Sequence, residues 1–365
     1  MMKKNFYVEI PNNVTIMEEN LVWSESKPDY LKHQAYADFI KSASFFQKIA
    51  SLLLFIKSSL LLILKRVTQY ERINYDLRKP KSISALFMLL NKLILNIFRL
   101  DSLNLKPHSE TEISQILEKY GCCVLTLDDH SFSIIEEAST QDFNKLSSKR
   151  QDSVSAEQRE FNESRAVSSF DSKLYKTINQ VWSDMGITKA VSKHLNKRSR
   201  LIDVNPQIND KSDSFWNNIF PDMGVKELPL SAYFHRDASG GDLKAILYMS
   251  NVGDLNGPFS YVLGSHKIQT SKIDDFIMEA NDNNGLSSTE SIKRKLFSAL
   301  PAKLQQKGSF GNDLYDKDFL SKSIQKSAWS ITAPKGSLII FDTKGIHRGG
   351  MVKESERSVI TTVIG

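Results

Sequence analysis

Apolar and polar residues follow two different periods along this chain, and a strand-like pattern prevails toward the C-terminus. Residues 336–343, GSLIIFDT, form an apolar run with β-branched and aromatic side chains, which is typical of a buried strand. From 358 to 364 apolar and polar residues alternate, which predicts a strand with one buried face. Two earlier runs, 122–127 and 201–207, are predicted as further strands. The pattern therefore predicts a core made mainly of β-strands.

Helical periodicity is found before and between these strands. Residues 110–119 form one predicted helix, and Gly121 after it is a natural C-cap because glycine adopts left-handed backbone conformations without strain. Residues 174–195 form another predicted helix. The long polar insert 268–330 lies between two groups of predicted strands and is expected to cover the site as a lid.

Two apolar helical segments precede this region. In the first, 49–64, the residues Ser51, Ser58 and Lys65 recur every seven positions and form one narrow polar stripe, so the rest of the circumference should be buried. The second segment, 83–100, has one apolar face, and the stretch between the two is rich in lysine and arginine. Apolar helices flanked by cations are typical of interfacial membrane anchors.

Three arrangements of the 49–100 region stay open. The helices could form a hairpin packed on the core or on another subunit, or they could contact a membrane peripherally. A transmembrane helix is the third, although 49–64 is shorter than a bilayer requires and contains Lys57. A Lys-Pro pair just after residue 105 marks the expected boundary between an N-terminal extension, 1–104, and a catalytic domain, 105–365.

Composition narrows the classes of protein. With 365 residues, 41% hydrophobic and 25% charged, the chain is ordinary for a globular protein. Its two cysteines are adjacent, which excludes a Cys-rich zinc site, and no secretory leader follows the first methionine, so a cytoplasmic location, peripheral to the membrane in one alternative, is expected. The net charge of +6 suits an acidic small molecule or an anionic lipid. No nucleic acid is expected, because the basic run 193–200 lacks interleaved aromatic residues.

The candidate chemistry lies in a His-x-Asp pair and one distant histidine. In an extended strand, His235 and Asp237 point to the same side, while the strand predicted at 336–343 brings His347 to its end. Two imidazoles and one carboxylate form the ligand set of non-haem Fe(II) oxygenases, which leaves positions for a chelating cosubstrate and O2. The sequence therefore predicts a metal site.

Arg357 is the candidate anchor for an anionic cosubstrate. It opens the last predicted strand, expected to pair beside the strand that carries His347, and a guanidinium binds a carboxylate through two parallel hydrogen bonds that lysine cannot copy. A surface ion pair with Glu354 or Glu356 is the alternative for this residue.

These motifs together resemble the phytanoyl-CoA dioxygenase-like family of Fe(II)/2-oxoglutarate-dependent oxygenases. The likeness rests on the H-x-D at His235, NGPFSYVLGSHK at 256–267, HRGG from His347 and the arginine at 357, and it covers roughly 105–365. It implies an α+β fold with a mainly β core: a double-stranded β-helix (jelly-roll, cupin-like) barrel with flanking helices and an N-terminal helical extension. One departure is Leu263, which stands where the family usually has proline before G-S-H.

The resemblance also implies roles for individual residues. His235, Asp237 and His347 would be the iron ligands, Arg357 would hold the distal carboxylate of 2-oxoglutarate, and Tyr248 would lie near the cosubstrate. Asp237 is a carboxylate, which argues against the halogenating relatives whose metal site lacks one.

The implied activity is that of a dioxygenase. With Fe(II), 2-oxoglutarate and O2 it would hydroxylate a C–H bond of a small-molecule or acyl/lipid-linked substrate and release succinate and CO2. The alternative is a non-catalytic barrel that acts as a membrane-associated binding or scaffold protein. A cupin-type metalloenzyme without 2-oxoglutarate would leave Arg357 unexplained.

Overall fold

The computed structural model describes residues 10–17, 43–73, 111–152, 165–210, 234, 236–237, 242–268, 324–350 and 352–365, and nine residues between 273 and 304. The predicted helical segment 83–100, the domain boundary near 105 and most of the insert 268–330 lie outside the described residues.

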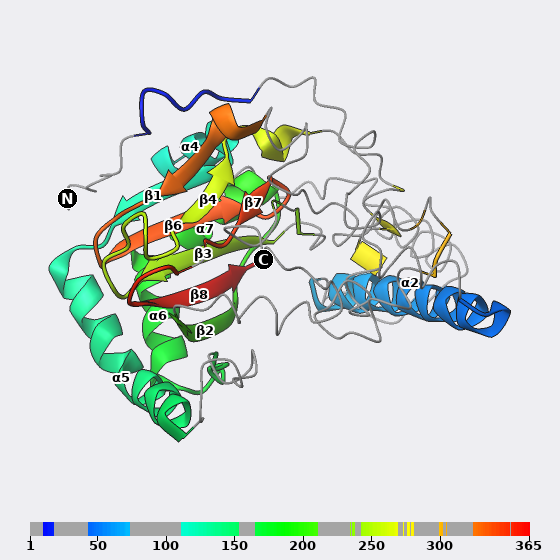
Figure 1. The fold of residues 1–365 in the computed structure, drawn as a ribbon, viewed down its shortest axis with the longest axis horizontal. Coiled ribbons are helices and arrows are strands. Elements are labelled where there is room, and N and C mark those ends of the chain that lie inside the picture. Colours follow the sequence, from blue (N-terminus) through cyan, green and yellow to red (C-terminus); the bar gives the residue numbers. More distant parts are fainter. Residues whose placement is uncertain are drawn as a thin grey trace, which may run out of the picture.

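Two antiparallel sheets form the core (Figure 1). From β3 to β8 the chain runs through the larger sheet, twice through the smaller one, and then back and forth between them, which is the jelly-roll arrangement. The predicted α+β fold with a jelly-roll core is therefore confirmed. The larger sheet has the order β1 (Cys122–Thr126), β6 (Ser337–Asp342), β3 (Leu243–Tyr248), β8 (Glu356–Ile364) and β2 (Leu201–Asp210), and the smaller has β5 (Ala328–Ile331), β4 (Phe259–Val262) and β7 (His347–Arg348).

Helices cover the face of the larger sheet that turns away from the smaller one (Figure 1). Trp182 of α6 and Leu117 of α4 share one hydrophobic cluster with strand residues such as Leu338 and Ile360. A second cluster lies between the two sheets. The helices are α4 (Glu112–Tyr120), α5 (Asp129–Asp152), α6 (Lys173–Asp184) and α7 (Ile187–Leu195), and short 3-10 turns are found at Ser265–Lys267 and Gln325–Ser327.

Strand β1 shows how the period of two divides these clusters. Cys123 belongs to the cluster under the helices, whereas Cys122 belongs to the cluster between the sheets. Both thiols are buried and free, and burial raises the pKa of Cys123 to about 12. These cysteines are packing residues on opposite faces of one strand.

The junction between α4 and β1 follows the prediction closely. Thr111 and Ser114 form a capping box at the start of α4, and Gly121 ends the helix with a φ of 77°. A Cβ at Gly121 would lie 2.4 Å from both Tyr261 Oη and His266 Nδ1, so the close approach also requires glycine. The glycine thus fixes α4 against the turn after β4.

Helix α2 (Phe45–Ile73) lies to one side of the sheets (Figure 1). Its stretch Phe45–Ile63 is long and apolar enough to cross a membrane, as no other helix in the described part of the chain is. The polar stripe, Ser51 and Ser58, is fully buried, whereas most of the large apolar residues are exposed. The helix therefore presents its serines to the protein, and the described residues leave most of its apolar circumference uncovered.

Candidate functional site

His347 occupies the short strand β7, where it pairs with Tyr261 of β4. Its side chain is 5% exposed, and its Nδ1 lies 2.9 Å from the Gly345 carbonyl oxygen. Because a carbonyl only accepts, Nδ1 donates, and the neutral ring then presents Nε2 as a lone-pair donor. Nε2 lies 3.6 Å from Asp237 Oδ2. The structure therefore brings two of the three predicted ligands together.

Asp237 is held by both its backbone and its side chain. Its N–H donates to the Thr343 carbonyl at 3.0 Å, in the turn between β6 and the strand of His347. Its Oδ2 accepts a hydrogen bond from Lys244 Nζ at 2.5 Å. Two donor atoms bound to one metal ion at about 2.1 Å lie roughly 3 to 3.5 Å apart. The imidazole of His347 and the carboxylate of Asp237 thus suit a shared ion in chemistry, and their 3.6 Å separation is close to that range.

His235 lies outside the described residues, and among the described residues no group of three or more metal-ligating side chains is found. Its two neighbours are described and buried. Arg236 donates from Nε to the Lys344 carbonyl at 2.5 Å. Phe234 packs under the Arg348 guanidinium, whose centre is 4.0 Å from the ring centroid. Both neighbours are therefore anchored to the segment 344–348, which carries His347.

The G-S-H turn positions the same segment before His347. Ser265 Oγ donates to the Val262 carbonyl at 2.6 Å and accepts from the Ile346 N–H at 2.7 Å, one residue before His347. The structure also explains the leucine at 263, because the Leu263 N–H donates to the Ser327 carbonyl at 2.9 Å. Proline has no N–H and could not make this bond.

The N-G-P motif contacts Gly350, the second glycine of the HRGG motif. A Cβ at Gly350 would lie 2.4 Å from both Gly257 C and Pro258 O, so the two backbones touch. Asn256 donates from Nδ2 to the Glu354 carbonyl at 3.0 Å and thereby ties this turn to the loop before β8. The two signature motifs are therefore one packed unit.

A cavity of about 230 Å³ opens beside His347, between the two sheets. Three cationic side chains line it: Arg165, Lys244 and Arg357. Its described lining contains no aspartate or glutamate, so the electrostatics favour an anion. The remaining lining residues are Asn205, Gln207, Ile246, Tyr248, Phe259, Phe341, Gly349, Val359, Thr361, Thr362 and Val363.

Arg357 reaches this cavity from the opposite sheet to His347. Strand β8 pairs with β2 and β3, not with the strand of His347 as expected from the sequence. Asn209 Oδ1 accepts from Arg357 Nε at 3.4 Å and from Nη2 at 3.2 Å, and Nη1 donates to the Gly257 carbonyl. Burial lowers the pKa of Arg357. Both Nη atoms carry a second N–H for a ligand.

The acidic neighbours of Arg357 in sequence make other contacts. Glu356 pairs with Arg150 at 3.1 Å, and the backbone carbonyl of Glu354 accepts from Asn256. In the described part of the chain Arg357 donates hydrogen bonds to Asn209 and Gly257, so the geometry favours the cavity over a surface ion pair.

Tyr248 forms part of the cavity wall with its ring. Its hydroxyl donates to the Ile331 carbonyl at 3.0 Å and accepts from the Phe259 N–H at 3.1 Å. Burial raises the pKa of Tyr248 to about 12. The hydroxyl links the two sheets, and a contact of the ring with a cosubstrate stays a prediction.

Arg165 enters the site through an isolated bridge to Gln207 of β2. Its Nη2 lies 3.9 Å from Asp203 Oδ2, and burial lowers the pKa of its guanidinium. Lys244 was missed by sequence reasoning, although a lysine within the apolar strand 243–248 is the signal that could have found it. These two cations complete the lining of the cavity.

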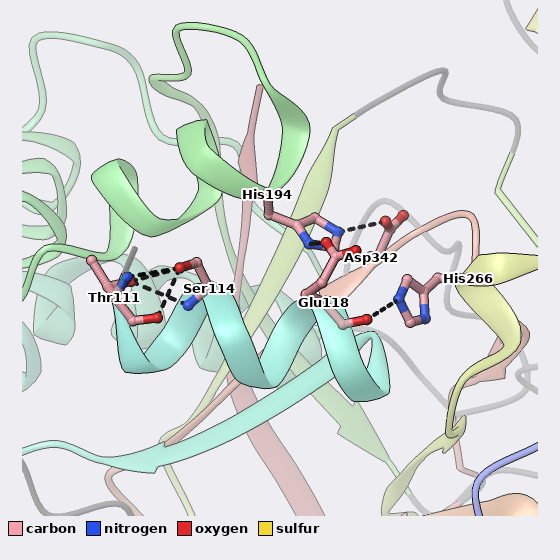
Figure 2. A network of polar contacts seen from close by, with 6 residues as sticks. All are labelled: Thr111, Ser114, Glu118, His194, His266 and Asp342. Atoms are coloured by element: carbon pink, nitrogen blue, oxygen red, sulfur yellow. Dashed lines mark hydrogen bonds and ion pairs between the residues drawn. The ribbon is translucent and has the colours of Figure 1, made fainter. Parts of the chain in front are cut away.

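The sequence analysis also did not predict a polar network at the end of β6 (Figure 2). Asp342, at the end of β6, accepts from His194 Nε2 of α7 at 2.8 Å and from the Lys344 N–H at 2.9 Å. Burial opposes ionisation of Asp342, but these hydrogen bonds and the His194 charge lower its pKa. His266 Nε2 donates to the Glu118 carbonyl at 3.1 Å. The network ties the end of β6, just before the turn that leads to His347, to α4 and α7.

No protein-family model matches the sequence, and no curated protein sequence matches it either. Several solved structures are similar in fold. AviO1 from Streptomyces viridochromogenes Tue57 is 9% identical over 71% of this chain and 95% of that chain, with a TM-score of 0.40. The epimerase SnoN, in complex with Fe3+, alpha ketoglutarate and nogalamycin RO, is 12% identical over 69% and 81%, with a TM-score of 0.40. EctD from S. alaskensis, with 2-oxoglutarate and 5-hydroxyectoine, is 11% identical over 71% and 77%, with a TM-score of 0.42.

Proposed function

We propose that this protein is an Fe(II)- and 2-oxoglutarate-dependent dioxygenase. The observation that carries the proposal is the position of the His347 and Asp237 pair beside a cavity with three cations and no acid in its described lining. A pair of metal-ligating side chains beside an anion site suits a chelating dicarboxylate cosubstrate. The sequence motifs that resemble the phytanoyl-CoA dioxygenase-like family support the same assignment.

In this proposal His235, Asp237 and His347 hold the iron. Bound iron with 2-oxoglutarate and O2 would supply the oxidant that hydroxylates a substrate C–H bond, with succinate and CO2 as the other products. The Gly345 carbonyl keeps the proton of His347 on Nδ1, which leaves Nε2 for the metal. Lys244 holds the Asp237 side chain and reduces the negative charge of the site.

Arg357 is proposed to bind the distal carboxylate of the cosubstrate. Asn209 and Gly257 fix the plane of its guanidinium, so less side-chain entropy is lost on binding than for a free arginine. Arg165 and Lys244 add positive charge to the same cavity. Apolar walls, including Phe259 and Phe341, exclude water around these charges and strengthen their attraction to an anion.

The proposed substrate is a small molecule or an acyl- or lipid-linked molecule, and the insert 268–330 is proposed to cover it. A cytoplasmic setting would provide Fe(II) and 2-oxoglutarate. Hydroxylation is favoured over halogenation because Asp237 places a carboxylate where a halide would have to bind.

An anaerobic titration of the purified apo-protein with Fe(II) and then 2-oxoglutarate tests the proposal. The weak visible charge-transfer band of the chelate is expected in the wild type and in His130→Ala, which changes an exposed histidine on α5. It is expected to be lost in His347→Ala. In Arg357→Lys the band should form only at higher 2-oxoglutarate concentrations. A folded wild type without a band would refute the proposal and favour the non-catalytic barrel.

A further inference from the structure

The outward face of α2 is apolar and open to solvent. Its exposed residues include Phe46, Leu53 and Leu60, which are 80%, 59% and 56% exposed. Soluble proteins rarely leave such a row of large apolar side chains on one helix face without a function. The other members of this outer face are Phe45, Ile49, Leu52, Ile56 and Leu61.

The inward face of the same helix is polar and fixed to the protein. Ser51 and Ser58 are 0% exposed, and Ser58 Oγ donates to the backbone carbonyl of Ala280. Leu62, on the same side, is 1% exposed. The helix is therefore oriented with its serines inward, and the apolar outer face is presented to the surroundings.

Charge on α2 is of one sign along most of its length. From 45 to 70 the sequence contains four cations and no acidic residue. At 3.6 residues per turn, Lys48 lies at one edge of the outer face, and Lys57 lies on the face near its other edge, between Phe46 and Leu61. Both are exposed. Lysines on and beside an apolar face can extend their long side chains to lipid phosphates while the apolar side chains enter the acyl region.

We infer that α2 is an interfacial helix that binds the surface of an anionic phospholipid bilayer. The flanking lysines and the net charge of +6 complement anionic headgroups. A second copy of the chain would bring like charges together, because each α2 carries cations alone between 45 and 70. An anionic membrane would bury the apolar side chains and place the lysines next to negatively charged headgroups.

The contacts of α2 argue against a transmembrane orientation. Lys57 lies inside the apolar stretch Phe45–Ile63 and would have to enter the hydrocarbon core. The buried side chains of Ser58 and Leu62 would also have to leave the protein. An orientation parallel to the membrane keeps these contacts and places the body of the protein on one side of the bilayer.

Co-sedimentation of the full chain with vesicles tests this inference. The wild type is expected to bind equimolar phosphatidylglycerol and phosphatidylcholine vesicles more tightly than phosphatidylcholine alone. Leu60→Glu should weaken binding at least about tenfold, since one buried leucine side chain is lost and a charge is added. Leu53→Glu should act alike. Val167→Glu, at a site 72% exposed and remote in sequence, is the matched control and should bind as the wild type does.

The electrostatic part is tested separately. Lys48→Gln and Lys57→Gln should each weaken binding to the anionic vesicles about fivefold and leave binding to phosphatidylcholine unchanged. Failure of the wild type to bind, or equal binding by Leu60→Glu, would overturn the inference. So would light scattering that shows a dimer converted to monomers by Leu60→Glu, or retention of the protein in cell membranes after alkaline carbonate washing.

Discussion

The contact between the two signature motifs predicts that adjacent glycines respond oppositely to the same substitution. Neither Gly349 nor Gly350 has a positive φ, so alanine causes no backbone strain at either position. At Gly350 the new Cβ would lie 2.4 Å from Gly257 C and from Pro258 O, both backbone atoms that cannot rotate away. At Gly349 nothing lies within 4 Å of the new Cβ.

The magnitude follows from these contacts. Forcing a methyl group into a packed backbone contact costs about 1 to 3 kcal/mol. In a domain of this size that lowers the melting temperature by about 2 to 6 °C. Gly349→Ala is instead expected to stabilise the chain by about 0.4 to 1 kcal/mol, because alanine reduces the entropy of the unfolded state.

Urea unfolding of the metal-free variants, followed by tryptophan fluorescence, measures the difference directly. A second readout is cosubstrate binding, because the Gly257 carbonyl accepts from Arg357 Nη1. Displacement of Gly257 in Gly350→Ala should weaken 2-oxoglutarate binding roughly tenfold, about the value of one charge-assisted hydrogen bond. Equal stability of Gly350→Ala and the wild type would refute the reasoning.

Three further predictions concern buried polar groups near the site. Ser265→Ala leaves the Ile346 N–H without its acceptor and should lower the free energy of urea unfolding by about 1 to 3 kcal/mol. Tyr248→Phe removes the donor to the Ile331 carbonyl and should cost a similar amount, while the 2-oxoglutarate titration stays unchanged; weaker binding would show that the hydroxyl contacts the cosubstrate. Burial lowers the pKa of His266 below the usual histidine pKa of about 6.5. The neutral side chain therefore contributes to stability at pH values above about 6.5, and this contribution is lost as the pH falls. The melting temperature should therefore drop less between pH 7.5 and 5.5 in His266→Gln than in the wild type, and an equal drop would contradict this role.

The sequence predicted those features that depend on local periodicity. The glycine C-cap at 121 and the strands around 122 and 337 were predicted because the period of two and the turn residues are local signals. The proximity of Asp237 to His347 was predicted from their placement on strands. The partners of the last strand were not, because a strand period does not say which sheet receives the strand.

Other features depend on pairs that are far apart in sequence. The contact of His194 with Asp342 joins residues separated by 148 positions, and no local pattern indicates it. For helix α2 the local pattern answered only part of the question. Its period correctly gave a stripe through Ser51 and Ser58, but a stripe alone does not say which side faces the protein.

The placement of the site residues in opposite sheets has a thermodynamic consequence. His347 belongs to the three-stranded sheet, and Arg357 belongs to the five-stranded sheet. A ligand held by both residues would act as a clamp between the sheets, and it would bind only the folded chain. At a concentration 100 times its dissociation constant, such a ligand adds about 2.7 kcal/mol to the free energy of unfolding. Resistance to melting would then report cosubstrate binding without any turnover, and a library of anions could be ranked by it.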